Sequence, residues 1–130
     1  MTAVDTLVAI VREEPEARSF AGVLSRQQVL VGTPTLLEAS MVMPSIVTEE
    51  VVDRALRRFL AEPWTRRVAF SVEMFDAAHV AFRRYGRGRG HPAKLNFGDC
   101  MSYAVAKVHG IPLLYKGEDF SQTDIVSALA

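Results

Sequence analysis

The sequence predicts an α/β fold, a three-layer α/β/α sandwich built on a short, mostly parallel sheet. Short apolar runs alternate with longer segments of helical periodicity, the pattern of a parallel sheet covered by helices on both faces. The chain has 130 residues, of which 49% are hydrophobic and 23% charged, so it can bury a core of its own. We see no internal repeat. We therefore expect a single domain spanning residues 1–130.

The first half of the chain contains two predicted strands and three predicted helices. Each strand is a short apolar run, and each helix begins where a capping residue or a proline precedes a helical pattern. Asp5 is the last residue of the first strand or lies just beyond it. Thr33 caps one helix, with Pro34 at its first position, and Thr48 caps the next. The strands lie within TAVDTLVAIV (2–11) and at QVLVG (28–32), and the helices at EPEARSFAGVLSR (14–26), TPTLLEASMVM (33–43) and TEEVVDRALRRFLAE (48–62).

The second half adds two strands and two helices. Ser71 caps the first of these helices and Gly86 ends it, while Gly110 ends the second. A basic, glycine-rich loop separates the two helices, and a polar loop follows the last strand. The strands are RRVAF (66–70) and IPLLY (111–115), the helices SVEMFDAAHVAFRRYG (71–86) and FGDCMSYAVAKVHG (97–110), and the loops RGRGHPAKLN (87–96) and KGEDFSQTD (116–124).

The composition limits the class of protein and its location. Fifteen basic and fifteen acidic residues cancel, so only local patches can indicate a polyanionic partner. The single cysteine, Cys100, cannot form an internal disulfide, which fits a reducing compartment. The N-terminal segment lacks the features of a signal peptide, and no apolar run is long enough to span a membrane. We expect a cytoplasmic protein with no membrane partner.

Four acidic residues stand where a parallel α/β sheet binds its ligands. Asp5 ends the first strand, and Glu38 lies a few residues into the helix after the second. Asp99 is in the first turn of the helix before the fourth strand, and Asp119 follows that strand. The carboxyl ends of parallel strands share one edge, so these side chains can meet there. Ionised carboxylates crowd together only around a cation, and an all-oxygen ligand set selects Mg²⁺ or Mn²⁺. Such a site suits phosphoryl chemistry.

Each acid also has a simpler explanation. Asp99 is as well placed to cap its helix as to bind an ion, because a carboxylate near a helix N-terminus is stabilising. Glu38 fits an ordinary surface glutamate, and Asp119 fits an ordinary turn residue. Asp5 is the hardest to explain in this way, because strands of this type are buried on both faces. A metal site is therefore indicated by the four acids together and by none of them alone.

Nearly the whole chain resembles a known family. HPAKLNFGDCMSYAVAKVHGIPLLYKGEDFSQTDI (91–125) is similar to the C-terminal signature of VapC-type toxins, which are PIN-domain ribonucleases. The stretches VDT, EPEA, LLEASMV and AFRRYGRG resemble the rest of that family. The resemblance implies a three-layer α/β/α fold, an endoribonuclease that depends on Mg²⁺ or Mn²⁺, and inhibition by a cognate VapB-type antitoxin. Carried over by motif, it assigns the catalytic and metal-binding roles to Asp5, Glu38, Asp99 and Asp119.

One stretch departs from the family pattern. Family members usually read Asp-Thr-Ser-Ala-Leu-Val-Ala after the first strand, whereas DTLVAI lacks the Ser-Ala pair. That serine normally lies beside the metal site, so either Thr6 replaces its hydroxyl, or the loop is rebuilt, or Asp5 is displaced. Two other residues are accessory candidates. Asn96 hydrogen-bonds near Asp99 or only caps its helix, and Asp124 adds an outer contact, although a role in the structure of the tail is favoured for it.

The basic loop before the last helix is a candidate RNA-binding surface. Its positive charge could steer an RNA backbone toward the acids, although a solvated helix end and loop explains it equally well. The glycines match no phosphate-binding loop. We expect the metal site to lie apart from these side chains. The RNA-binding candidates are Arg87, Arg89 and Lys94, near Arg83, Arg84 and His91.

Three functions remain open from the sequence. The first is the endoribonuclease toxin, and the second is a PIN-fold module that binds RNA or its antitoxin with little or no nuclease activity. A flavodoxin-like receiver or nucleotide-binding domain ranks last, because no glycine-rich loop follows the first strand. The middle helices carry more apolar residues than one small domain needs, and we assign them to a homodimer face and to a groove for an antitoxin helix. These residues are Met41, Val42, Met43, Ile46 and Val47.

Overall fold

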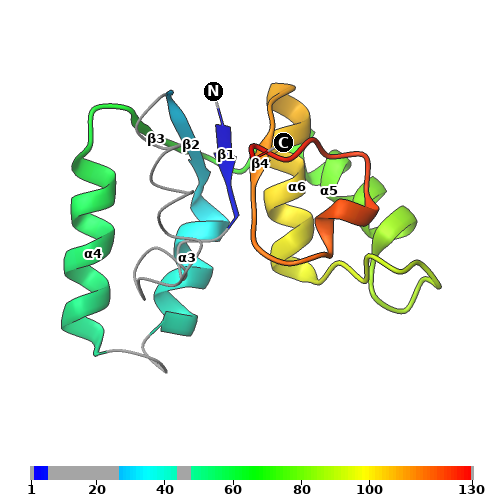
Figure 1. Cartoon of the computed structure of the whole chain (residues 1–130), viewed down its shortest axis with the longest axis horizontal. Coiled ribbons are helices and arrows are strands. Elements are labelled where there is room, and N and C mark those ends of the chain that lie inside the picture. The colour runs from blue at the N-terminus through cyan, green and yellow to red at the C-terminus, as the bar shows by residue number, and fades with distance from the viewer. Residues whose placement is uncertain (1, 6–26, 44–47, 130) are drawn as a thin grey trace.

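The structure, a computed structural model, describes residues 2–5, 27–43 and 48–129. In these ranges four short strands form a parallel sheet in the order β3-β2-β1-β4 (Figure 1). β1 lies inside the sheet, where Ala3 is the partner of Leu30 on one side and of Leu113 on the other. The predicted parallel sheet is confirmed. Its strands are β1 (Thr2–Val4), β2 (Val29–Gly32), β3 (Thr65–Val68) and β4 (Leu113–Leu114).

The described part of the chain also contains four α-helices, and local signals set their ends. The hydroxyls of Thr48 and Ser71 accept hydrogen bonds from backbone N–H groups in the first turns of two of these helices, as predicted. Gly110 ends the last helix at φ 62°, a conformation that glycine adopts without steric cost. None of the described helices is long and apolar enough to cross a membrane. They are α3 (Thr33–Val42), α4 (Glu49–Ala61), α5 (Val72–Tyr85) and α6 (Phe97–His109).

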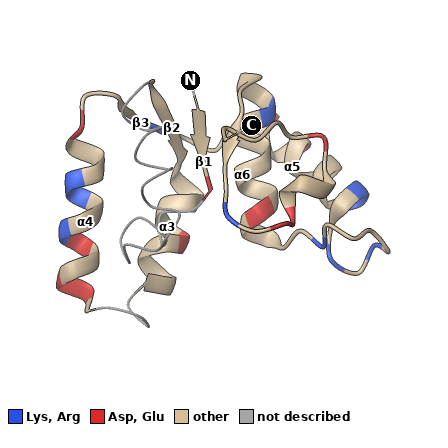
Figure 2. Ribbon diagram, in the orientation of Figure 1, with Lys and Arg blue, Asp and Glu red and all other residues tan. Residues whose placement is uncertain are grey.

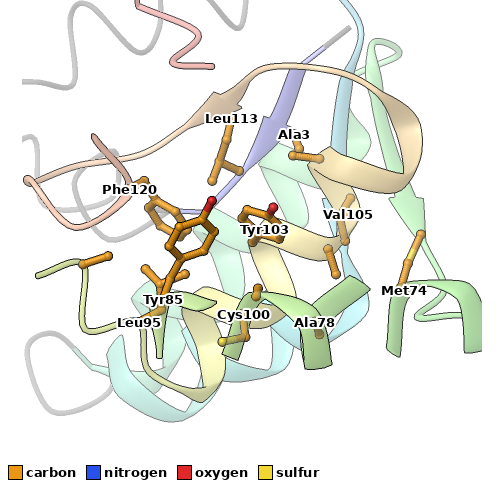
Figure 3. Close-up of a cluster of buried hydrophobic side chains, with 14 residues drawn as sticks. Ala3, Met74, Ala78, Tyr85, Leu95, Cys100, Tyr103, Val105, Leu113 and Phe120 are labelled. Carbon is orange, nitrogen blue, oxygen red and sulfur yellow. The ribbon is translucent and has the colours of Figure 1, made fainter. Parts of the chain in front are cut away.

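Two buried clusters on opposite faces of the sheet give the fold its three layers. Successive side chains of a strand point to opposite faces. Ala3 and Leu113 therefore pack with α5 and α6, while Val4 and Leu114 pack with α3 and α4. Figure 3 shows the first cluster, in which Tyr103 of α6 lies beside the strands. The α/β/α sandwich predicted from the alternation of strands and helices is confirmed.

Several local predictions need correction. The N-cap of α3 is Gly32, and Thr33 is already helical without a side-chain cap. β3 begins and ends earlier than predicted, at Thr65 and Val68. The polar loop after β4 contains a short 3-10 helix, η2 (Phe120–Gln122), because the ring of Phe120 is buried against the core. The helix predicted at 14–26 lies outside the described residues.

Candidate functional site

Asp5 lies directly after β1, at the carboxyl edge of the sheet. This is one of the two positions that the sequence predicted for it. Its backbone N–H donates to the carbonyl of Leu114 in β4 (2.9 Å), which holds the residue beside that strand. Burial raises the pKa of the Asp5 carboxyl from 3.8 to about 7, although a hydrogen bond from the Ser102 hydroxyl opposes the shift. The negative charges that raise it further are those of Asp99, Glu38 and Asp119.

Glu38 extends from α3 to the beginning of α6. Its carboxylate lies against the backbone of Gly98, so closely that a Cβ built on Gly98 would overlap it, with the Glu38 Cδ only 2.7 Å away. Glu38 keeps contact with solvent, yet burial raises its carboxyl pKa above the ordinary value, and the charge of Asp99 adds to the shift. The absence of a side chain at Gly98 therefore lets Glu38 lie beside Asp99.

Asp99 caps its helix and also lies beside the other acids. Its Oδ2 accepts a hydrogen bond from the backbone N–H of Asn96 (3.0 Å), and Asn96 Oδ1 accepts one from the N–H of Asp99 (2.9 Å). Burial raises the pKa of the Asp99 carboxyl, the bond from Asn96 lowers it, and the charge of Asp119 raises it. The two explanations that the sequence left open for Asp99 are therefore compatible, because the capping box holds its carboxylate in place.

Asp119 completes the group from the segment between β4 and η2, where it is exposed. Its charge acts on both Asp5 and Asp99. Figure 2 shows acidic positions at the end of β1, on α3 and on α6, around the carboxyl edge of the sheet. We call these four residues, Asp5, Glu38, Asp99 and Asp119, the acid cluster. The structure brings them into one neighbourhood, while their catalytic and metal-binding roles remain predictions.

The donor set of the acid cluster suits a hard divalent cation. It offers only carboxylate oxygens, and a buried carboxylate such as Asp5 is costly to ionise without a compensating charge. Within residues 2–5, 27–43 and 48–129, however, no three acidic, histidine or cysteine side chains are gathered closely enough to hold one ion as they stand. The charges of the acids thus raise pKa values within the cluster, but the carboxylates are not close enough together to bind one ion. Binding of an ion by the cluster would therefore require its side chains to move closer together.

Two buried hydroxyls adjoin the acid cluster, and the sequence analysis missed both. Ser102 on α6 is 2% exposed and Thr35 on α3 is 4% exposed, and their hydroxyl oxygens are 3.1 Å apart. Ser102 also hydrogen-bonds to Asp5. A signal was present: Ser102 follows Asp99 by three residues and Thr35 precedes Glu38 by three, so each hydroxyl shares a helix face with an acid.

The basic loop is tied down at its base, and the charge of one of its arginines acts on the acid cluster. The N–H of Leu95 donates to the carbonyl of Tyr85 (2.9 Å), and the N–H of Arg87 donates to the carbonyl of Leu95 (3.0 Å). The charge of Arg87 lowers the pKa of Asp99, so Arg87 acts on the acid cluster, although the basic side chains were expected to lie apart from the predicted metal site. Arg89 lies over the ring of Phe82 instead, 5.7 Å from its centroid.

The remaining candidates take structural roles or lie outside the described residues. Asp124 accepts hydrogen bonds from the Tyr103 hydroxyl and from Lys107, both 2.7 Å long, which hold its pKa below the usual value although burial alone would raise it. It therefore organises the tail, the role that the sequence favoured. His91 Nδ1 accepts from the Ala93 N–H and supports the loop. Thr6 lies outside the described residues.

Replacing Gly98 with alanine is expected to push the Glu38 carboxylate away from Asp99. The helix gains up to about 1 kcal/mol in propensity from alanine, and the overlap with Glu38 offsets part of that gain. In a Glu38→Ala background the overlap is gone, so the same change should stabilise by the full amount. Urea unfolding of the four proteins measures this coupling. Equal stabilisation in both backgrounds would contradict the contact.

Comparison with known proteins identifies the family to which this fold, with its acid cluster, belongs. Residues 3–126 match the PIN domain family. The chain belongs to that family, and within it to the group of VapC-type ribonucleases. A ribonuclease VapC of Mycolicibacterium smegmatis is 43% identical over 122 residues, 93% of each chain. Ribonuclease VapC30 of Mycobacterium tuberculosis is 41% identical over 122 residues, 93% of this chain and 92% of that one.

A solved structure supports the same fold. VapC20 of Mycobacterium tuberculosis, described as a Sarcin-Ricin loop cleaving toxin, matches with a TM-score of 0.77 over 97% of both chains. At 16% sequence identity, this similarity is one of fold. The predicted fold class and the resemblance to VapC-type PIN domains are therefore confirmed.

Proposed function

We propose that this protein is an endoribonuclease toxin that depends on Mg²⁺ or Mn²⁺ and is inhibited by a VapB-type antitoxin. The observation that carries the proposal is the acid cluster at the carboxyl edge, in a chain whose relatives are ribonucleases. The curated relatives cover almost the same length as this chain, so the proposal concerns the whole domain.

The residues of the acid cluster would share the work of such an enzyme. Asp5, Glu38, Asp99 and Asp119 would hold the ion, which when bound activates water and offsets charge that develops on the phosphate. Asp5 is fixed by its backbone bond to β4, and Asp99 by its bond from Asn96. Glu38 has the longest side chain of the four and solvent on one side, which suits it to adjust as RNA enters.

Cleavage of RNA by the purified protein tests the proposal. A hairpin with a single-stranded loop should be cut in the presence of Mn²⁺, and EDTA should stop the reaction until the metal is restored. Cleavage that continues in EDTA would contradict metal dependence. Binding of the hairpin without any cleavage would instead support the non-cleaving PIN-fold module that the departure at DTLVAI kept open.

We further propose that the basic loop guides RNA to the acid cluster. Lys94 has φ 50°, a left-handed conformation that asparagine tolerates better than alanine, so the charge is best removed as Lys94→Asn. Combined with Arg89→Ala, this change should weaken RNA binding and reduce its salt dependence. The slope of the logarithm of the binding constant against the logarithm of the salt concentration should fall by roughly 0.7 for each lost phosphate contact. Single-turnover cleavage at saturating RNA should change far less.

A matched pair of cations on α4 provides the control for this experiment. Arg54→Ala with Arg58→Ala removes the same charge from exposed positions outside the loop, on α4. The slope should stay as in the wild type for this pair. A slope equally unchanged for Arg89→Ala with Lys94→Asn would show that the loop is a solvated surface. Arg87 is left out, because its charge acts on Asp99 and its removal would also disturb the acid cluster.

The partners are proposed on the same footing. Similar folds were solved as a toxin–antitoxin complex from Klebsiella pneumoniae and as VapBC2 of Rickettsia felis with promoter DNA, with TM-scores of 0.72 and 0.73. An antitoxin and a second copy of this chain would bind apolar surface on α3, where Met41 and Val42 are exposed. Met43 is buried in the core, which corrects its assignment to that surface. Ile46 and Val47 lie outside the described residues. A monomeric mass in light scattering would contradict the homodimer.

We also propose a cytoplasmic location. Cys100 is a free thiol buried on α6, where burial raises its pKa to about 11 and leaves it an inert part of the core. An RNA substrate would be reached in the same compartment. Secretion of the untagged protein into the medium by its own host would contradict this location.

A further inference from the structure

α3 and α6 meet along a row of three contacts that ends at the acid cluster. A Cβ on Gly32, just before α3, would lie 2.9 Å from Val105 Cγ2 on α6. Next along the row, the hydroxyl of Thr35 lies 3.1 Å from that of Ser102. Glu38 then lies against Gly98. Residue numbers rise along α3 and fall along α6, so the helices run in opposite directions and each step is about one turn.

In the middle contact, between Thr35 and Ser102, the number of protons available decides which hydroxyl is the hydrogen-bond donor. A serine hydroxyl has one proton to donate and can accept in return. When Asp5 is ionised, as it must be to bind a cation, its carboxylate can only accept, and Ser102 donates its proton to it. Thr35 then donates the hydrogen bond that joins it to Ser102. Two buried hydroxyls from different helices thus form a donor chain that ends on Asp5.

We propose that Thr35 and Ser102 are positioning residues for the acid cluster: their donor chain orients the Asp5 carboxylate. This inference rests on the proposed metal-dependent function. It also answers the question raised by the missing Ser-Ala pair after Asp5, because α6 supplies a serine hydroxyl to Asp5 from a distant part of the sequence.

A purely structural role would not require this arrangement. Where two helices cross in an apolar environment, a hydroxyl pair can be replaced by apolar groups of the same shape at little cost. The hydroxyl pair matters because Ser102 also bonds to the Asp5 carboxylate, and hydrogen bonds to a charged group are stronger than those between neutral groups. A bound ion needs Asp5 deprotonated and correctly turned, and outer groups that orient a ligand commonly change metal affinity by 10- to 100-fold.

Calorimetric titration of Mn²⁺ into matched variants tests the proposal. Ser102→Ala should weaken Mn²⁺ binding about tenfold. Thr35→Val, which keeps the shape without the hydroxyl, should weaken it less, and Thr35→Ser should restore binding close to the wild type. In the Ser102→Ala background, Thr35→Val should have no further effect, because its action passes through Ser102. At saturating Mn²⁺, cleavage should recover most of its kcat with KM for RNA unchanged.

Ser40→Ala is the control, because this exposed hydroxyl on α3 donates only to the carbonyl of Leu36. It should leave Mn²⁺ affinity unchanged. Wild-type affinity in Ser102→Ala, or in Thr35→Val if the first variant does not fold, would overturn the donor chain while leaving the nuclease proposal intact. Equal loss in Thr35→Val and Thr35→Ser would also overturn it, because the hydroxyl would then not matter. A wild-type protein that binds no Mn²⁺ would overturn the proposed function itself.

Discussion

Replacing Asp99 with asparagine is expected to abolish RNA cleavage and to leave the metal-free protein as stable as the wild type or more so. The side-chain oxygen of asparagine can still accept the hydrogen bond from the Asn96 N–H, so the helix cap survives. The pKa of Asp99 is raised by burial and by Asp119, so its negative charge is unfavourable in the folded protein. The change therefore removes repulsion and, with it, a charge that the reaction needs.

The experiment needs cleavage and melting temperature measured on the same preparations. Asp76→Asn is the matched control, because it makes the same chemical change at an exposed position on α5. It should leave both quantities unchanged. An Asp99→Asn protein that cleaves RNA near the wild-type rate would remove Asp99 from the proposed site. One that melts far below the wild type would show that the carboxylate mainly supports the fold.

Mn²⁺ or Mg²⁺ is expected to raise the melting temperature, and to do so more strongly at pH 8 than at pH 5. An ion that binds only the folded state stabilises it by mass action, by about 2.7 kcal/mol at a hundred times its Kd. Ca²⁺ should also stabilise but should not support cleavage. The pH dependence follows from Asp5, whose pKa is about 7. Asp5 is mostly protonated at pH 5, where an ion must displace that proton, and mostly ionised at pH 8.

The same pKa predicts the opposite trend without metal. An acid whose folded-state pKa is raised binds its proton more tightly when folded, so the metal-free protein should lose stability as pH rises from about 4 to 7. Thermal melts in EDTA and in Mn²⁺ across this range should therefore diverge. Asp5→Asn should flatten both trends. Melting curves that respond to Mn²⁺ equally at pH 5 and pH 8 would exclude Asp5 from the site.

The carboxyl-edge rule and the family resemblance found the four acids, because each follows or precedes a strand recognisable from its own residues. The rule could not show how the acids are supported. Thr35 and Ser102 belong to helices far apart in the sequence, and only the packing of α3 on α6 reveals that they meet. The role of Gly98 also depends on this packing, because its missing side chain leaves space for Glu38 of α3.

Other differences have the same origin in long-range packing. Arg87 was expected to lie apart from the predicted metal site, together with the other basic side chains of the loop. The pairing of Gly86 with Leu95 closes the base of that loop and brings Arg87 near Asp99. Met43 appeared to be surplus apolar surface from its neighbours, but it fills the core beneath α4. Local patterns predict elements, while the surroundings of each side chain depend on distant partners.

The position of β1 inside the sheet has a consequence for how the protein is made. Asp5 emerges during synthesis well before β4, α6 and the segment before η2, which supply neighbours of Asp5 in the sheet and in the acid cluster. Domains fold as units while they are being synthesised, and contacts between distant segments wait for both to be present. A growing chain therefore carries isolated carboxylates and no assembled site. Nuclease activity would begin only after the segment before η2 has been translated and packed beside β1, so a ribosome-bound chain that ends before this segment would not cleave RNA.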